Sequence, residues 1–192
     1  MANIRKRANL YLALLHYPVY DKNKRVVSTA LTNLNIHDIA RTARTFGIAK
    51  YYLITPLKRQ QMLTERILSY WRSGFGAQYN PKRKDALELV TISDSLNNVC
   101  EDIHNQWGDK PKTIVTDAQL LDKSIDYLEI KKMIEEVPRP YLLLLGTGWG
   151  ITEDIIRDSD YVLAPIRGLT DYYHLSVRSA AAIILDRLLG KR

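Results

Sequence analysis

Apolar residues recur along the chain in two alternating patterns, as short continuous runs and as longer stretches with a helical period. Short runs bounded by turn residues are typical of buried strands, and apolar residues repeated every three to four positions are typical of amphipathic helices. The short runs predict strands at 9–15, 51–55, 87–91, 112–116, 141–145 and 161–166. The helical stretches predict helices at 28–46, 60–71, 93–107, 127–136, 152–157 and 172–189.

This regular alternation of strands and helices predicts an α/β fold with a largely parallel sheet flanked by helices. The chain of 192 residues is long enough for one domain with a sizeable core, and it contains no repeat or clear linker, so we expect a single domain over 1–192. Residues 72–85 form the longest irregular stretch and are predicted to be a loop. Loops of that length are often functional.

Charge narrows the choice of partners. Lys and Arg number 28 against 21 Asp and Glu, which leaves a net charge of +7. Such an excess favours a polyanionic partner such as nucleic acid, although a merely solvated basic surface would have the same composition. The positive residues cluster at 5–7, 22–25 and 82–84, and this clustering strengthens the nucleic-acid interpretation.

The sequence pattern indicates neither a membrane span nor a metal site. No apolar run reaches the ~18 residues of a membrane span, and the N-terminus lacks the apolar core of a signal peptide, so we expect a cytoplasmic protein without membrane contact. The single cysteine, Cys100, excludes an internal disulfide or a thiolate cluster, and the four histidines show no ligand spacing. We therefore expect no metal site.

Three glycines at alternate positions, Gly146, Gly148 and Gly150, follow the buried leucine run at 142–145. A turn that only reverses the chain is one explanation, and a loop that lets a ligand reach bare backbone is the other. The spacing departs from the GxGxxG of dinucleotide-binding loops, and only 42 residues follow Gly150. Glu153 and Asp154 open the next helix and would repel a pyrophosphate, so a neutral or cationic ligand fits better.

Two more segments, 35–48 and 164–184, join the glycine loop in a recognisable order. Together the three segments resemble the three motifs of the SPOUT superfamily of S-adenosylmethionine (SAM)-dependent RNA methyltransferases. Asn35 and Arg41 have the spacing of the SpoU-type first motif, and 142–150 supply the leucine-rich strand and glycines of the second. The last segment particularly resembles small SPOUT RNA methyltransferases that share HLSVRSA, some of them carried as domains beside a tRNA guanine methylase.

The resemblance implies a fold, an activity and a partner. The C-terminal helix would be threaded through a loop to form a deep trefoil knot, one of the rare exceptions to unknotted chains. The protein would be a homodimer that binds SAM in the knot and methylates RNA, with tRNA or rRNA as substrate. The alternatives are a non-catalytic SPOUT-fold RNA-binding protein and, with less support, a dinucleotide-dependent oxidoreductase.

The same resemblance implies site residues. The implied catalytic residues are Arg41, Asn35 and His174. The implied cofactor-binding residues are Leu144, Leu145, Gly146, Thr147, Gly148, Ala164, Ile166, Gly168, Tyr173 and Leu175. Independently of the resemblance, the basic residues expected to bind RNA are Arg72, Lys82, Arg83, Lys84 and Arg178.

Each role has a plainer alternative. Arg41 would otherwise be a surface arginine, Asn35 a turn or helix-cap residue, and Arg178 the ion-pair partner of Asp186 or another acid. Aromatic residues between 70 and 79 are interleaved with the basic residues and would either stack on bases or anchor the loop to the core.

The sequence also departs from the family pattern at three positions. His37 replaces the glycine of the first motif, Gly148 stands where SpoU-type enzymes carry an acidic residue, and His174 replaces an asparagine of the third motif. These positions lie where the acceptor is handled. The departures therefore leave SAM binding plausible but argue against assuming a ribose 2′-O acceptor.

Overall fold

The computed structural model describes residues 9–191. The strands are β1 (Leu10–Leu15), β2 (Val19–Tyr20), β3 (Val26–Val27), β4 (Tyr51–Ile54), β5 (Val90–Ser93), β6 (Lys112–Thr116), β7 (Ser124–Ile125), β8 (Tyr141–Gly146) and β9 (Tyr161–Leu163). The helices are α1 (Asn33–Thr45), α2 (Lys58–Arg72), α3 (Phe75–Tyr79), α4 (Pro81–Leu87), α5 (Leu96–Trp107), α6 (Tyr127–Glu136), α7 (Glu153–Asp158) and α8 (Val177–Leu189).

Seven strands form one sheet in the order β5-β4-β1-β8-β6-β9-β7, and every neighbouring pair in it is parallel. The remaining two, β2 and β3, form a small antiparallel hairpin. Strands in the middle of a parallel sheet are covered on both faces, which is why β1 and β8 are nearly continuous apolar runs. The predicted α/β fold with a parallel sheet is confirmed.

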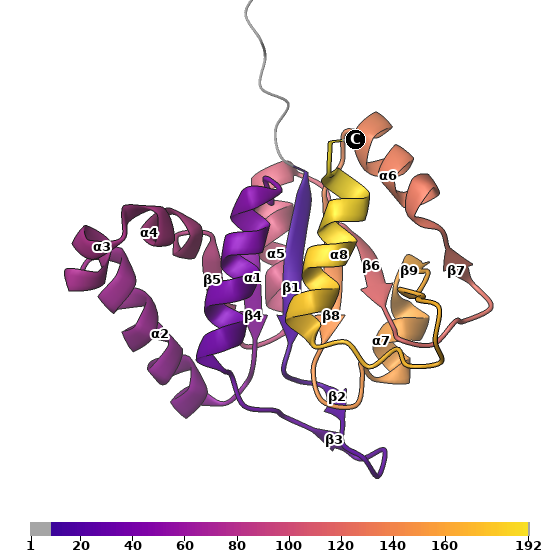
Figure 1. Ribbon diagram of the computed structural model, residues 1–192, viewed down its shortest axis with the longest axis horizontal. Helices are drawn as coiled ribbons and strands as arrows, with labels where there is room; N and C mark the ends of the chain where they lie inside the picture. Colours follow the sequence, from indigo (N-terminus) through magenta and orange to yellow (C-terminus); the bar gives the residue numbers. More distant parts are fainter. Residues whose placement is uncertain (1–8, 192) are drawn as a thin grey trace, which may run out of the picture.

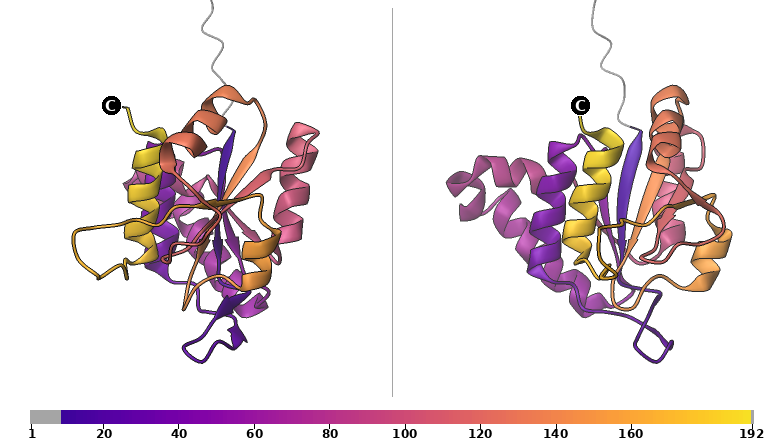
Figure 2. Two further views of the ribbon diagram at one scale, coloured as in Figure 1. Left: turned by 90° about the vertical axis from the view of Figure 1, so that its right-hand side faces the viewer. Right: turned by 45° about the vertical axis from the view of Figure 1, so that its right-hand side comes forward.

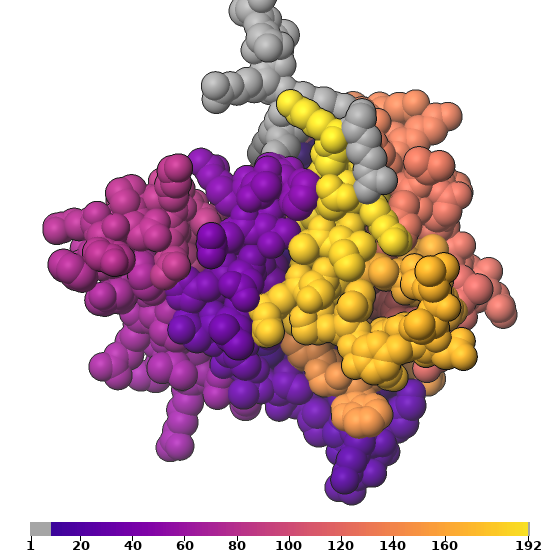
Figure 3. All heavy atoms as spheres, viewed as in Figure 1, coloured from indigo at the N-terminus to yellow at the C-terminus, as the bar shows by residue number. Residues whose placement is uncertain are grey.

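Two layers of helices cover the sheet (Figures 1 and 2). Alternate side chains of β1 point to opposite faces, so Leu12 packs with α1, α6 and α8, whereas Ala13 packs with α5 and α7. Helices α1 and α8 lie side by side on one face of the molecule, although they are far apart in the sequence (Figure 3).

Two predicted helices begin five residues later than expected. The helix predicted from residue 28 begins at Asn33, because the Thr32 side chain caps it by accepting a hydrogen bond from the Asn35 backbone N–H. The helix predicted from residue 172 begins at Val177, because Ser176 caps it in the same way. Both caps lie inside apolar patterns that continue across them, so the pattern alone overextended the helices.

The prediction of a loop over 72–85 was wrong. After Arg72 the chain forms two short helices, α3 and α4, and Asn80 caps the second helix while Pro81 occupies its first turn. Because α4 takes up Leu87, the strand predicted at 87–91 is displaced to Val90–Ser93. Helices α2, α3 and α4 form an arm that projects from the sheet, at the left of Figure 1, and we call it the α2–α4 arm.

The hairpin of β2 and β3 and the short edge strand β7 were not predicted, since each has only two residues. Within residues 9–191, no helix is long and apolar enough to cross a membrane. The basic cluster at 5–7 lies outside the described residues.

Candidate active site

The carboxyl ends of the parallel strands meet at one edge of the sheet, where open α/β folds bind their ligands. In the sheet, β4 and β5 lie on one side of β1, and β8, β6 and β9 lie on its other side. The segments that follow β1, β8 and β9 therefore meet at this edge. These are the segments that contain the glycine loop and the last motif.

The glycine loop, which we define as 146–151, is held by the hairpin. The Trp149 backbone N–H donates to the Tyr20 carbonyl at 2.9 Å, and the Tyr20 N–H donates to the Gly150 carbonyl at 2.9 Å. Gly148 has φ 61°, and a Cβ there would lie 2.8 Å from the Tyr20 carbonyl oxygen. Only glycine fits this backbone. The close approach at Gly148 is thus made by the protein's own hairpin.

The open side of the loop lies at Gly150, which has φ 107°. A Cβ there would have only one neighbour within 4 Å, the Asp117 carboxylate oxygen at 3.9 Å. The first turn of the adjacent α7 adds Glu153 and Asp154. Carboxylates repel an anionic ligand and attract a cationic one. The surroundings of the loop therefore suit a neutral or cationic group, as the sequence predicted, and Asp117 is a residue that the motif comparison missed.

The threonine of the loop joins three segments. Its hydroxyl donates to the Leu15 carbonyl at 2.9 Å and lies 2.6 Å from the Thr29 hydroxyl. Thr147 thereby ties the end of β1 to the approach to α1. The strand residues Leu144 and Leu145 are at most 1% exposed, so the structure buries both of these predicted cofactor-binding residues in the sheet.

The segment between β9 and α8 has no regular structure and swings out in a wide loop (Figure 2). Its start is anchored, because the Ala164 N–H donates to the Ile125 carbonyl at 2.8 Å and Ile166 packs against the core. Beyond Ile166 the contacts are local. The Arg167 guanidinium lies 4.7 Å from the Tyr173 ring centroid, and nothing lies within 4 Å of a Cβ built on Gly168.

His174 and Leu175, two further residues of the predicted site, are exposed on this segment. The His174 ring meets the Tyr172 ring edge-on, with centroids 5.7 Å apart. Both side chains are therefore exposed to solvent.

The first motif and the start of α8 are joined by a polar cluster. The Asn35 side-chain oxygen accepts a hydrogen bond from Arg178 Nη1 at 3.3 Å, and Arg178 Nε lies 3.4 Å from the Asp38 carboxylate. The interpretation of Asn35 as a helix cap was wrong, since Thr32 is the cap. The ion-pair alternative for Arg178 is confirmed, and its partner in this cluster is Asp38, an acid other than Asp186.

The Arg41 side chain is exposed, and its guanidinium makes no hydrogen bond or ion pair with any described residue. Its side chain lines a surface hollow of about 390 Å³ between α1 and α8, together with Asp38, Thr42, Thr45, Phe46 and Ala182. The guanidinium is therefore available to a ligand or to another chain. Within residues 9–191, no hydrogen bond or ion pair joins it to the glycine loop.

A buried histidine that the motifs did not single out ends β1. His16 is fully buried, and neither ring nitrogen has a hydrogen-bond partner among the described residues. Burial lowers its pKa to about 4, and this effect exceeds the opposing effect of the Leu14 backbone, which raises the pKa. The imidazole is consequently neutral at physiological pH. The nearby Ser28 hydroxyl is also buried without a partner in this part of the chain.

The predicted RNA-binding residues of the arm have different surroundings. The Arg72 guanidinium donates to the Leu87 carbonyl at 3.1 and 2.7 Å and also to the Val90 carbonyl, so it braces the arm from within. Arg83 lies 4.5 Å above the Trp71 ring. Lys82 is exposed, and Lys84 forms only a 3.9 Å contact with Glu88. Arg72 is thus a structural residue, whereas Lys82 and Lys84 remain accessible.

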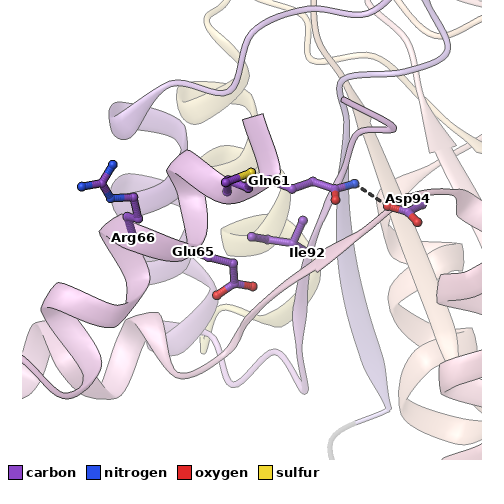
Figure 4. Close-up of a pocket in the computed structure, with 6 residues that line it drawn as sticks. Gln61, Glu65, Arg66, Ile92 and Asp94 are labelled. Carbon is purple, nitrogen blue, oxygen red and sulfur yellow. Dashed lines mark hydrogen bonds between the residues drawn. The ribbon is translucent and has the colours of Figure 1, made fainter. Parts of the chain in front are cut away.

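A second hollow, of about 420 Å³, lies between α2 and β5 (Figure 4). Gln61 donates a hydrogen bond to Asp94 there, and Lys58 lies 3.0 Å from the same carboxylate. These partners lower the pKa of Asp94. Strands β4 and β1 separate β5 from β8, so this hollow is distinct from the glycine loop. In residues 9–191 no group of three or more His, Cys, Asp or Glu could hold a metal ion.

Comparison with known proteins places this architecture. The chain matches a family model described as SAM-dependent RNA methyltransferase over residues 9–190. An uncharacterized protein of Aquifex aeolicus is 40% identical over 183 residues, which cover 95% of this chain and 89% of that protein. A tRNA (guanine-N(1)-)-methyltransferase of Oleidesulfovibrio alaskensis is 43% identical over 182 residues, which cover 95% of this chain but only 42% of that enzyme.

Among solved structures, a TrmH/SpoU tRNA modifying enzyme of Aquifex aeolicus is similar with a TM-score of 0.55 and 17% identity, covering 96% of this chain and 76% of that one. This likeness concerns the fold alone, and it confirms the predicted SPOUT-type architecture, whereas the trefoil knot stays a prediction. The family model extends over almost the whole described chain. The chain therefore belongs to the family of SAM-dependent RNA methyltransferases.

Proposed function

We propose that this protein methylates a tRNA or an rRNA with SAM bound between the glycine loop and the segment 164–175. The observation that carries the site is the open face of Gly150 with the Asp117 carboxylate beyond it. Family membership argues against the dinucleotide-dependent oxidoreductase, and it favours catalysis over a purely RNA-binding role.

The donor side consists mainly of backbone. SAM supplies a methyl group on a positively charged sulfonium, which the acceptor atom displaces in line. Asp117 would stabilise the positive charge, and the main chain of Gly146, Thr147 and Gly150 would contact the nucleoside. Ile166, Tyr173 and Leu175 would cover it from the other side. Gly148 contributes by letting the loop pack on the hairpin.

The acceptor side is proposed to lie near Arg41 and His174. Arg41 has an unpaired guanidinium that can hold a phosphate or support the acceptor. Asn35 is engaged by Arg178, so we propose that this pair positions α8 against α1. His174 is exposed beside the segment that would cover SAM and can accept a proton.

One relative supports a choice of RNA class. The tRNA (guanine-N(1)-)-methyltransferase of Oleidesulfovibrio alaskensis contains a region similar to this chain within less than half of its length. This supports the proposed place of the chain in the HLSVRSA subgroup and makes a tRNA the first substrate to test. We further propose a cytoplasmic homodimer with a C-terminal trefoil knot.

Isothermal titration with SAM tests the donor site. SAM is expected to bind once per subunit, and Asp117→Asn is expected to weaken binding about 10-fold, because it removes the charge that faces the sulfonium. Asp122→Asn, an exposed carboxylate in the same loop, is the matched control and should bind SAM normally. Equal affinities for all three proteins would remove Asp117 from the site.

Transfer of a labelled methyl group from SAM to bulk tRNA and to rRNA then tests the activity. Incorporation into either pool supports the proposal and identifies the RNA class. SAM binding without transfer to either RNA would favour the non-catalytic alternative.

A further inference from the structure

Two aromatic side chains stand exposed at the end of the α2–α4 arm. Phe75 and Tyr79 are 66% and 76% exposed. Their rings stack, with centroids 6.0 Å apart and planes inclined by 23°. They lie four positions apart on α3, so one helical turn places both on the same face. Clustered exposed apolar side chains mark interaction sites on soluble proteins.

The inner side of α3 is packed firmly against the rest of the arm. A Cβ on Gly76 would lie 2.7 Å from the Trp71 ring and 2.8 Å from the Tyr70 ring, so no residue with a side chain fits there. Trp71 in turn meets the His37 ring of α1, with centroids 5.4 Å apart. The packing holds α3 in place, and the aromatic pair is therefore displayed in a fixed position before any partner binds.

The charge of the arm favours a polyanion as the partner. Between residues 58 and 89, seven basic residues stand against three acidic ones. The basic residues are Lys58, Arg59, Arg66, Arg72, Lys82, Arg83 and Lys84, and the acidic ones are Glu65, Asp85 and Glu88. Exposed aromatic rings beside accessible cations are the combination that binds single-stranded nucleic acid, with rings stacking on bases and cations meeting phosphates.

We propose that Phe75 and Tyr79 form a stacking platform for an unpaired base of the RNA substrate, with Lys82 and Lys84 close to its phosphates. This inference rests on the proposed function and narrows its substrate class. Bases inside a duplex are already stacked on each other, so the platform selects RNA with a loop, a bulge or a free end. Continuous duplex RNA would meet only the cations.

Fluorescence anisotropy with two labelled RNAs tests the platform. One RNA is a hairpin with an unpaired loop, and the other is a fully paired duplex of equal length. The double variant Phe75→Leu/Tyr79→Leu keeps apolar side chains but removes both rings. It is expected to bind the hairpin about 10- to 100-fold more weakly, the range for lost base stacking, and to bind the duplex as the unchanged protein does.

Two controls separate stacking from folding. Tyr79→Trp keeps an aromatic ring and should bind the hairpin within about twofold of the unchanged protein. Leu128→Ala alters an exposed apolar residue on α6, away from the arm, and should have no effect. The midpoint of thermal unfolding is measured for each variant, and the Phe75→Leu/Tyr79→Leu protein is compared only at temperatures where it is folded.

Three results would overturn the platform while the proposed function stands, provided that the protein still binds SAM. These are unchanged hairpin affinity of Phe75→Leu/Tyr79→Leu, an equal loss for hairpin and duplex, and a change in self-association in place of RNA affinity. The last result would mean that a second copy of the chain covers the rings. Failure of the unchanged protein to bind either SAM or RNA would instead count against the proposed function.

Discussion

Arg41 is the residue on which the acceptor side depends most. It is exposed and unpaired within residues 9–191, so its replacement should alter chemistry more than stability. Arg41→Ala is expected to leave SAM affinity intact and to lower methyl transfer by roughly 10²- to 10⁴-fold, the usual range for a positioned charged group. Arg41→Lys should recover little, because a planar guanidinium is not replaced by a point charge.

Methyl-transfer rates and the midpoint of thermal unfolding are measured together for the Arg41 variants. The neighbouring Arg44→Ala, also exposed on α1, serves as the matched control. Full transfer activity in Arg41→Ala would show that our interpretation of the first motif is wrong. The acceptor site would then have to be sought at His174.

Gly148 is expected to matter for folding before it matters for SAM. Its φ of 61° and the 2.8 Å approach of the Tyr20 carbonyl leave no room for a Cβ. Gly148→Ala should therefore lower the free energy of unfolding by about 1–3 kcal/mol. Gly168→Ala, where a Cβ meets nothing within 4 Å, should be nearly neutral. Denaturant titration compares the two, and equal stabilities would refute this assignment.

His16 is expected to make stability depend on pH. Burial lowers the pKa of this histidine from 6.5 to about 4, so between these values the unfolded chain binds a proton that the folded chain does not. Above pH 6.5 the histidine is neutral in both the folded and the unfolded chain, and it does not lower the free energy of unfolding. The free energy of unfolding should fall by ~1.4 kcal/mol per pH unit as the pH drops through this window.

His16→Leu should flatten that part of the pH profile. Leucine fills the site and binds no proton in either the folded or the unfolded chain. His104→Gln replaces an exposed histidine and should keep the slope. Urea titrations from pH 4 to pH 7 measure the effect. A His16→Leu profile parallel to that of the unchanged protein would contradict the assignment.

At the scale of elements, Arg72 holds the α2–α4 arm together. Its guanidinium donates to the Leu87 and Val90 carbonyls, which joins the end of α2 to the end of α4 and the start of β5. Arg72→Ala is expected to lower the free energy of unfolding by about 2 kcal/mol, because it leaves partly buried carbonyls without their charged donor. Lys82→Ala, an exposed cation on the same arm, should change stability by less than about 0.5 kcal/mol.

Hydrogen exchange locates this effect. Amides of α3 and α4 should exchange faster in Arg72→Ala, while those of β1 and β8 should not, since Arg72 contacts β5 and β4 lies between β5 and these strands. Unchanged exchange throughout the arm would show that Arg72 does not stabilise the arm, and the prediction that it binds RNA would stand again.

At the scale of the whole molecule, we expect the proposed homodimer to form through the outward face of α1 and α8. It carries the hollow lined by Arg41, Thr45 and Phe46. Thr45→Arg places a charged, bulky side chain on this face and should convert dimers to monomers, as light scattering after size-exclusion chromatography would show. Leu128→Arg on α6 should leave the mass unchanged. A protein that is monomeric at all concentrations would refute the homodimer.

Local patterns determined much of this protein without any coordinates. Continuous apolar runs predicted the central strands, because residues buried on both faces of a parallel sheet must be apolar. The order of the three motifs predicted the SPOUT-type architecture and the SAM-dependent RNA methyltransferase family. Motif spacing is a property of the chain alone, and it survives in the sequence whatever the packing.

Only the tertiary structure decided which of these residues meet. Asn35 and Arg178 are far apart in the sequence and join because α1 and α8 pack on the same face of the sheet. Asp117 lies beside the glycine loop because β6, which it follows, is the neighbour of β8 in the sheet. The Arg72 side chain points into the arm because the carbonyl at the end of α4 accepts its hydrogen bonds. Contacts of this kind depend on how distant segments are brought together, and a period of two or of 3.6 residues contains no information about them.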